Sequence, residues 1–477
     1  MKAGQKRNLM LAGGFFTLLI IVTIITLFLF DINSYRSKIE SVTSEATGLD
    51  VAIKGKVSLS LFPFGLSAKD VHATDKGGQV LALERLGIRA ELLPLLRGQL
   101  KITGCELVKP SLTIVKDKGG KYNFTRVGKK SKESSPGRPF SLNELNISKG
   151  TLVYLDQKTG EKTEWNGINL AARDLSLADS YGEIIRNLSF TGSIDCRELI
   201  KKDLKIDNIK SSVKAEKGVF VLTPLTMEIF GARGEGGVTL DCARADFEYK
   251  INLKVPTLDF DSLMKSFGAE RMIGGKGDLM VSLTVKEKEG RFLRNGIDGT
   301  LSLRGDNLTT YTVDLDKVLT SYETSQEFNL ADIGVYFIAG PLGPIALKAY
   351  RYGDLYYQSR GGRGTVMHFV SHWNIKNGKA EAIDCALATR NNRVALKGKL
   401  NFVSERYEGV TVALLDDKGC AKFKQSIRGS FGSPQVGTVS AVESIAGPIL
   451  NVYRQAKQFI QGGKCEVFYR GSVQQPR

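Results

Sequence analysis

The sequence predicts a mainly β protein held at a membrane by one N-terminal transmembrane helix. Three observations support this prediction. Residues 9–30 form one uninterrupted apolar run, apolar residues alternate with a period of two from Val51 onward, and helical periodicity returns after Val313. We therefore expect a transmembrane helix, then an antiparallel β-sheet with one apolar face, and finally a mixed α+β C-terminal part.

The apolar run has the properties of a retained membrane anchor. At about 1.5 Å of rise per residue it reaches roughly 33 Å, enough to cross a hydrocarbon core of about 30 Å. Lys2, Lys6 and Arg7 precede it, which predicts a cytoplasmic tail at residues 1–8 and the remainder of the chain on the other side. A cleaved signal peptide would have a shorter apolar stretch and a small-residue cleavage site. This run instead ends in Leu-Phe-Leu-Phe.

The chain directly after the anchor changes from helical to strand periodicity. Apolar residues at steps of three and four predict an amphipathic helix that ends at Gly48. Beyond it, segments of alternating polarity separated by Gly, Asn and Asp turns predict a β meander with one apolar face. The apolar positions singled out on these strands are Leu59, Leu61, Leu112, Ile114, Ile251 and Leu253.

A weak internal repeat supports the β prediction. Residues 100–114 resemble residues 140–154 at an offset of 40, so that Lys109 coincides with Lys149 and Leu112 with Leu152. We expect the two copies to stack side by side as hairpins of a repeating array. Residues 129–138, between the copies, are charged and free of apolar side chains, which predicts a linker or loop.

The C-terminal third mixes helices and strands. Leu315, Val318, Leu319 and Tyr322 indicate a helix, and the apolar residues that follow continue to a stop at Gly340-Pro341. A last helical stretch is predicted at residues 439–461, interrupted at Gly447-Pro448.

Composition and motifs argue against nucleic-acid binding and catalysis. The formal net charge is +17, but the cations are dispersed rather than gathered into a stripe. Dispersed positive charge fits an anionic lipid surface nearby, although a merely basic soluble surface stays open. His368 and His372 lie in a segment that is typical of a strand, which separates them too far for one metal. No nucleophile or phosphate-loop motif occurs, so we expect no enzyme activity, no metal and no cofactor.

The six cysteines have no metal-ligand spacing. An exported domain meets an oxidising compartment, and we predict a disulfide between Cys420 and Cys465. For the other four cysteines, disulfide pairing and free thiols are both open alternatives.

A sheet with one apolar face must cover that face with protein or with a ligand. Few amphipathic helices are predicted between residues 50 and 310. The sheet therefore either folds on itself as a sandwich or forms a groove for hydrophobic chains. Beside a membrane, lipid acyl chains are the expected cargo of such a groove.

Several blocks of the sequence resemble the AsmA family, which is related to the TamB-type bridge-like lipid transfer proteins. The resembling blocks are residues 31–40, 47–55, 57–64 and 92–96 near the N-terminus, and residues 313–316, 332–334, 339–343, 371–373, 393–398, 419–420 and 465–472 in the C-terminal part. The resemblance implies an extended, curled β-sheet with a hydrophobic groove, on a periplasmic protein anchored in a bacterial inner membrane. It also implies a role in phospholipid transport and outer-membrane biogenesis.

The domain organisation that follows has six parts. They are a cytoplasmic tail at 1–8, the transmembrane helix at 9–30, an AsmA-like N-terminal region at 31–128, a linker at 129–138, a β-groove region at 139–310 and an AsmA-like C-terminal domain at 311–477. The favoured hypothesis is phospholipid handling, with the six strand residues above lining the groove. The alternative is a scaffold or regulator of outer-membrane protein assembly, which would use sheet edges to bind unfolded β segments. The expected partners are phospholipids, the inner membrane, and outer-membrane or other envelope proteins, with no nucleic acid.

Overall fold

The computed structural model describes residues 32–75, 78–97, 99, 101–123, 140–177, 184–244, 246–266, 272–288, 291–311, 313–325, 330–342, 362–441 and 467–474. Within these ranges no helix is long and apolar enough to cross a membrane. The predicted transmembrane helix, the cytoplasmic tail and the linker at 129–138 lie outside them. Those three assignments therefore stay predictions.

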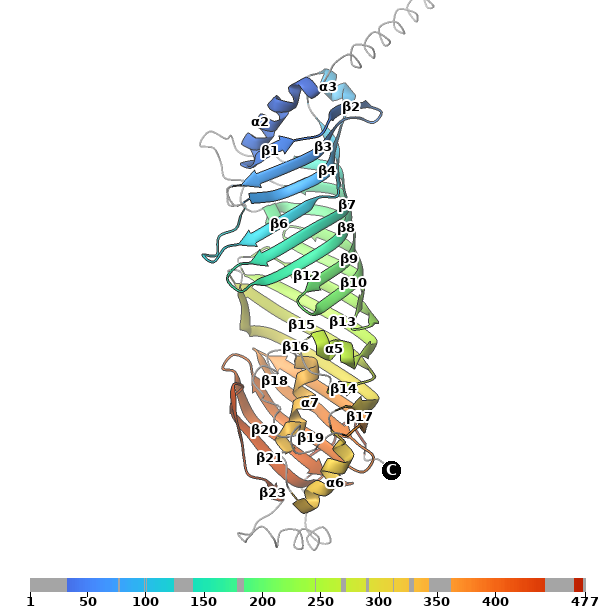
Figure 1. The fold of residues 1–477 in the computed structure, drawn as a ribbon, viewed down its shortest axis with the longest axis vertical. Helices are drawn as coiled ribbons and strands as arrows, with labels where there is room; N and C mark the ends of the chain where they lie inside the picture. Colours follow the sequence, from blue (N-terminus) through green and yellow to red (C-terminus); the bar gives the residue numbers. More distant parts are fainter. Residues whose placement is uncertain are drawn as a thin grey trace, which may run out of the picture. The chain divides into compact units, whose positions relative to one another are not determined.

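The chain divides into two compact units, residues 1–160 and residues 161–477, and each is described by itself. Both are built mainly of long strands (Figure 1). The protein is thus mainly β, as the alternation of apolar residues predicts, and its large curled sheet is mixed in strand direction.

The first unit begins with a helix that packs on a sheet. A short 3-10 turn, η1 (Ile32–Tyr35), leads into α2 (Arg36–Thr47), which ends at Gly48 in the left-handed conformation with φ 74°. This end is where the sequence predicts it. The strands are β1 (Asp50–Ile53), β2 (Val57–Leu61), β3 (Phe64–Asp75), β4 (Gly78–Ala90), β5 (Ile102–Val108), β6 (Ser111–Lys116) and β7 (Phe140–Asp156), and the short helix α3 (Leu92–Leu96) joins β4 to β5.

The first unit is not wholly antiparallel, which corrects one part of the expected fold. β1 and β2 both pair with β3, and β4 pairs antiparallel with β3, β5 and β6. β7, however, runs parallel to β5 and β6. Alternation could not reveal this, because it fixes which face a side chain occupies and not the direction of the neighbouring strand.

The second unit is an antiparallel succession of strands with helices toward its C-terminal part. Each of β8 to β12 pairs with the next strand, β13 pairs with β15, and β15 to β21 again pair in sequence, while β14 pairs with β16. The strands are β8 (Glu161–Leu177), β9 (Leu188–Lys201), β10 (Leu204–Glu216), β11 (Val219–Ile229), β12 (Ala232–Asp241), β13 (Phe247–Asp259), β14 (Ile273–Gly274), β15 (Lys276–Lys288), β16 (Arg291–Thr310), β17 (Gly364–Lys376), β18 (Lys379–Ala388), β19 (Arg393–Asn401), β20 (Arg406–Leu415), β21 (Ala421–Ser430), β22 (Ser433–Val436) and β23 (Ser440–Ala441).

Four helices accompany these strands: α4 (Ile184–Asn187), α5 (Phe260–Ser266), α6 (Leu315–Ser325) and α7 (Leu330–Leu342). α6 and α7 confirm the helical periodicity after Val313. α7 runs through Gly340-Pro341, so the predicted stop is two residues early. The predicted helix at 439–461 lies almost entirely outside the described residues.

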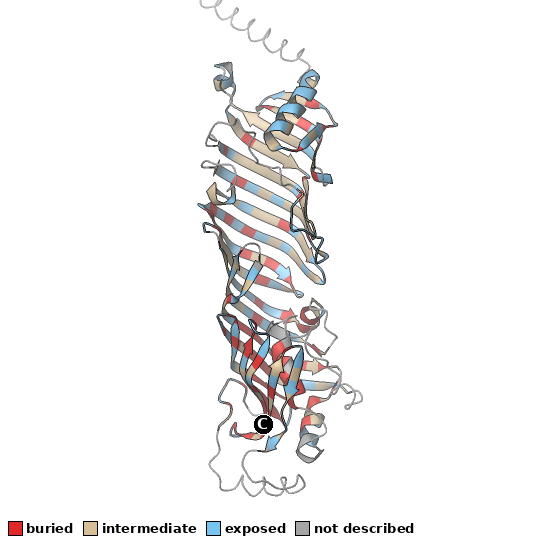
Figure 2. Ribbon diagram, turned by 90° about the vertical axis from the view of Figure 1, so that its left-hand side faces the viewer, coloured by how far each residue is buried: buried red, intermediate tan, exposed pale blue. Residues whose placement is uncertain are grey.

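The large hydrophobic core belongs to the C-terminal part of the second unit. α7 packs on β16, β17, β19, β20 and β21, and α5 packs on β13 and β14. Phe260, Phe337, Phe369 and Trp373 are all buried there. Within this unit, Figure 2 shows buried positions gathered where these helices pack, while the strands β8 and β9 carry mostly intermediate positions.

Candidate functional site

The first unit carries rows of apolar side chains that run across its strands. One row joins Leu59, Leu66, Ile88, Cys105 and Leu145, which are direct partners on β2, β3, β4, β5 and β7. All five are half-buried. A protein core formed by these residues alone would bury them fully, so this row is an apolar surface with incomplete cover from described residues.

A second row of the first unit contains another predicted groove residue. Val51, Ala73, Leu81, Leu112 and Leu152 pair across β1, β3, β4, β6 and β7. Leu112 contacts a small cluster formed by Leu49, Ala73 and Val80. Ile114 pairs with Tyr154 and is half-buried. Leu61 is placed on β2 opposite Phe64, and its side chain lies outside the described ones.

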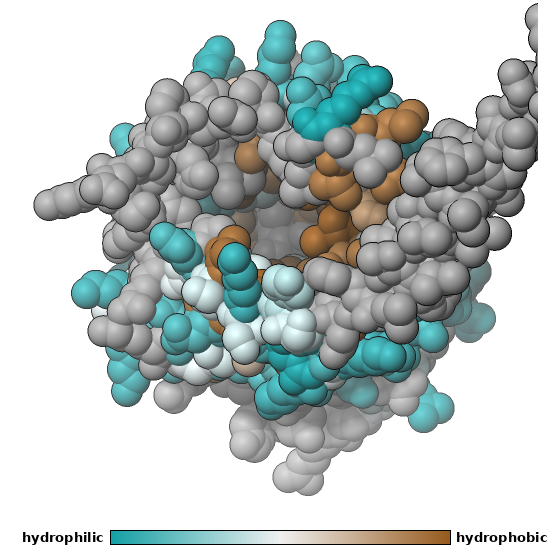
Figure 3. All heavy atoms as spheres, turned by 90° about the horizontal axis from the view of Figure 1, so that it is seen from above, coloured by the Kyte–Doolittle hydropathy of each residue, from teal (hydrophilic) through white to brown (hydrophobic). Residues whose placement is uncertain are grey.

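The hollow of this unit is visible in a view toward the end at which α2 and β1 lie. Figure 3 shows an opening in the middle of this end, with hydrophobic residues gathered along part of its wall and hydrophilic residues over the outer surface. An apolar wall beside an opening is suited to a ligand with hydrocarbon chains.

α2 is fixed to the strands by polar contacts as well as by packing. The Glu40 carboxylate accepts a hydrogen bond from the Ile53 N–H at 2.6 Å, and the Ser44 hydroxyl accepts one from the Val51 N–H at 2.9 Å. Ile39 packs against the cluster of Ile53, Val57 and Val71. The helix that follows the predicted anchor is therefore part of the folded unit.

The first strands of the second unit also carry rows of apolar side chains. Trp165, Leu199 and Ile206 form one row across β8, β9 and β10, and Leu170 pairs with Ile194 in another. These side chains are half-buried. Among the described helices, only the four-residue α4 is close to β8, whereas α5, α6 and α7 pack further along the chain.

Ile251 and Leu253 lie where this apolar face passes into the core. Ile251 is in a half-buried row with Leu222, Val238 and Leu283. The row of Leu253 continues through Val281 to Leu301 and ends at Trp373, which is 0% exposed. The same apolar face is thus open on its first strands and covered by α7 on its last ones. Contact of any of these residues with lipid stays a prediction.

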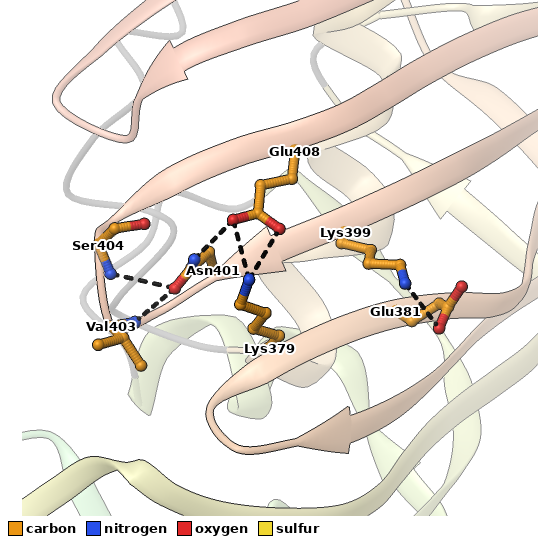
Figure 4. Close-up of polar contacts among 7 residues, drawn as sticks. All are labelled: Lys379, Glu381, Lys399, Asn401, Val403, Ser404 and Glu408. Atoms are coloured by element: carbon orange, nitrogen blue, oxygen red, sulfur yellow. Dashed lines mark hydrogen bonds and ion pairs between the residues drawn. The ribbon is translucent and has the colours of Figure 1, made fainter.

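The opposite face of the second unit is polar. Figure 4 shows Lys379 paired with Glu408 at 3.3 Å, Lys399 paired with Glu381 at 3.3 Å, and Asn401 donating a hydrogen bond to Glu408 at 2.6 Å. The hydrogen bond from Asn401, followed by the contact with Lys379, holds the pKa of Glu408 below its ordinary value. These charges are exposed and paired, as on a solvated surface.

The described residues contain no group of three or more His, Cys, Asp and Glu side chains that could hold a metal. His368 and His372 both lie on β17, which confirms the strand that the sequence predicts there. His368 contacts Asp306 at 2.7 Å on the surface.

The cysteines fall into two groups. Cys105, Cys196, Cys242 and Cys385 are free thiols, and Cys420 is disulfide-bonded. Cys465 lies outside the described residues, so its pairing with Cys420 stays a prediction. Val467, two residues further on, forms a β-bridge with Cys420.

Several C-terminal blocks of the family resemblance meet in one polar cluster. Arg393 donates hydrogen bonds to the carbonyls of Asp416 and Val473 at 2.9 and 3.2 Å. Tyr469 and Ser472 both donate to the carboxylate of Asp384. The cluster fixes residues 467–474 to β18 and β19. Sequence reasoning did not find Asp384, because its partners lie 85 and 88 residues away.

Fold and surface together define a mainly β protein in which each unit has an apolar sheet face that the described residues cover incompletely. The AsmA family model matches residues 1–195. The match spans the first unit and continues into β9. Residues 1–195 of the chain belong to the AsmA family. No curated protein and no solved structure matches it.

Proposed function

We propose that this protein binds phospholipid acyl chains on the apolar sheet faces of its two units, as a step of lipid transport in the bacterial envelope. The observation that carries the proposal is the set of half-buried apolar rows on strands over which few described helices pack. AsmA family membership supports an envelope-related, bridge-like lipid transport role.

Acyl chains fit this surface because the interaction is not directional. Burial of apolar surface contributes about 25 cal/mol per Å², so side chains such as Leu170 and Ile194 favour any hydrocarbon that displaces water from them. The proposal includes no catalytic step, cofactor or metal.

The proposed location follows from the chain's first residues. Residues 9–30 anchor the protein in the inner membrane by a single pass, with the N-terminus cytoplasmic and the bulk of the chain periplasmic. Fusion of alkaline phosphatase after residue 477 tests this, because that enzyme is active only after export. An inactive fusion, made at normal levels, would contradict the orientation.

Lipid binding is tested on two matched pairs of substitutions. Leu170→Glu with Ile194→Glu places two carboxylates on the apolar face of β8 and β9. Ala171→Glu with Ser193→Glu places them on the exposed positions next to these residues. The full chain is purified in a mild detergent, and phospholipid that stays bound is measured by mass spectrometry.

The proposal expects bound phospholipid in the wild type and in the Ala171/Ser193 variant, with a loss of at least fivefold in the Leu170/Ile194 variant. Absence of phospholipid from the wild type would overturn it, and so would equal loss from both variants. Recovery of unfolded outer-membrane protein segments in place of lipid would favour the assembly-factor alternative.

A further inference from the structure

Two loops of the first unit expose large apolar side chains to an unusual degree. Phe62, in the turn between β2 and β3, is 95% exposed, and Leu93 in α3 is 71% exposed. They are the two most exposed large hydrophobic residues of the described chain. Leu92 and Leu95, also in α3, are 44% and 36% exposed. Large apolar side chains that are gathered at one place on a folded surface mark an interaction site.

The two loops lie at the same end of the strands of this sheet. Leu61 pairs with Phe64 on either side of the first loop, and Gly65 pairs with Arg89 at the end of β4, just before α3. The Glu91 N–H then donates a hydrogen bond to the Lys101 carbonyl, which closes the loop that contains α3. Figure 1 places α3 and the β2 hairpin at the same end of this unit as the start of α2.

The predicted anchor leads to the same strand. Val57 N–H donates to the Asn33 side chain at 3.3 Å, which joins the first described turn to β2. Phe30, the last residue of the apolar run, is three residues before Asn33, at most about 10 Å of extended chain. From Val57 to Leu61, β2 spans about 13 Å. The exposed loops are therefore within reach of the bilayer in which residues 9–30 are proposed to lie.

The charge beside the loops suits a lipid surface. Arg97 directly follows α3 and is exposed, and Lys101 is exposed four residues later. Lys101 also forms an ion pair with Glu91 at 2.6 Å. Leucine and phenylalanine beside basic residues are typical of segments that lie in a membrane interface.

We propose that Phe62 together with Leu92, Leu93 and Leu95 of α3 forms an apolar rim that enters the surface of the phospholipid bilayer next to the anchor. The rim would hold the open apolar face of the first unit against the membrane, where acyl chains leave the bilayer. This inference rests on the proposed inner-membrane anchoring.

The test places a tryptophan on the rim of the full-length protein in phospholipid vesicles. Leu93→Trp is compared with Tyr122→Trp. Tyr122 is 40% exposed and follows β6, at the opposite end of the strands of the same sheet. Fluorescence is measured with and without lipids brominated near the headgroup, and the signal of the native Trp165 and Trp373 in the wild type is subtracted.

We expect a blue-shifted emission for Leu93→Trp and quenching by brominated lipid at least threefold stronger than for Tyr122→Trp. Equal quenching of the two variants would overturn the inference. A blue shift without quenching would overturn it as well, because it would indicate that protein covers the rim.

A second variant separates this inference from the proposed function. Phe62→Ser with Leu93→Ser is expected to slow the transfer of phospholipid from vesicles into the protein by about tenfold, while phospholipid bound in detergent stays at the wild-type amount. Unchanged transfer would overturn the rim and leave lipid binding intact. If this variant has lost its bound phospholipid already in detergent, the rim is not separate from the lipid-binding surface.

Discussion

Lys109, between β5 and β6, and Lys149, on the neighbouring parallel strand β7, occupy equivalent positions of the repeat, and both have positive φ, 48° and 55°. The Lys109 N–H donates to the carbonyl of Ser148 on β7 at 2.8 Å. The offset of 40 in the internal repeat is thus also the register of the sheet, since Gly104 pairs with Glu144 and Leu112 with Leu152.

The positive φ has a consequence for the apolar face. Leu107 and Leu112 are five residues apart, so a regular pleat would place them on opposite faces. Both instead pack against clusters that share Val51 and Leu81. The positive φ at Lys109 therefore interrupts the regular alternation, so that the apolar residues of β5 and β6 stay on one face.

Substitution of Lys149 tests this backbone geometry. A β-branched residue adopts positive φ poorly and glycine adopts it readily. We expect Lys149→Ile to lower the free energy of unfolding of the first unit by about 1–3 kcal/mol, and Lys149→Gly to lower it by less. Limited proteolysis in rising urea measures both. Lys69→Ile, at an exposed site on β3 without positive φ, is the control and should change little.

The internal repeat shows how much of this fold can be predicted from the sequence. The match between the copies predicts that they lie side by side, and they do, because identical alternation allows apolar residues to pair in register. The copies are parallel and are not hairpins, because the first copy forms β5 and β6 in line and the second forms the single strand β7. A period of two is the same in either direction, so the sequence pattern could not reveal the parallel pairing of Leu112 with Leu152.

The site is predictable to a similar extent. Period-two alternation places Ile251 and Leu253 on an apolar face, and both lie in apolar rows. It does not tell which rows a helix covers. The cover over Trp373 comes from α7, and tertiary packing of this kind leaves no local signal in the strand that it covers.

Asp316 links α6 to the turn between β18 and β19, and its loss should destabilise the second unit. Its carboxylate accepts hydrogen bonds from the Thr389 hydroxyl and from the backbone and side-chain amides of Asn391. Burial alone would raise the pKa of Asp316, but these bonds hold the pKa below its ordinary value. We expect Asp316→Ala to lower the free energy of unfolding by about 1–2 kcal/mol at pH 7.

The effect should depend on pH in one direction. Because the folded-state pKa of Asp316 is depressed, its stabilisation is present above the unfolded pKa of about 3.9 and is lost as the pH falls through the folded value. The difference between wild type and Asp316→Ala in urea unfolding should therefore shrink from pH 6 to pH 3. Asp246→Ala, an exposed turn residue, should show no such trend. A difference that grows on acidification would refute this account.

Phe337 holds α7 on the sheet. It is 0% exposed, its ring stacks on Phe369 with centroids 5.8 Å apart, and its carbonyl accepts a hydrogen bond from Ser371 at 2.6 Å. Phe337→Ala should lower the free energy of unfolding of the second unit by about 3–5 kcal/mol. Phe292→Ala removes a ring that is 65% exposed and should cost under about 1 kcal/mol. Similar urea midpoints for the two variants would mean that α7 is not part of the core.

Cys105 provides a native reporter of what covers the apolar face. It lies half-buried between Ile88 and Leu145 in the row that starts at Leu59. Burial raises the pKa of its thiol, so little thiolate is present at pH 7. Cys385, buried in the core with its pKa raised to about 12, should not react at all in the folded protein.

We expect an apolar maleimide to label Cys105 in protein stripped of lipid, and added phospholipid to slow this labelling at least fivefold. Acyl chains lying along the row would exclude the reagent, and labelled peptides are counted by mass spectrometry. The variant Cys105→Ser identifies any signal from Cys196 or Cys242, which are buried. If phospholipid leaves the labelling rate of Cys105 unchanged, the row from Leu59 to Leu145 is not part of the lipid site, whatever the strands of the second unit bind.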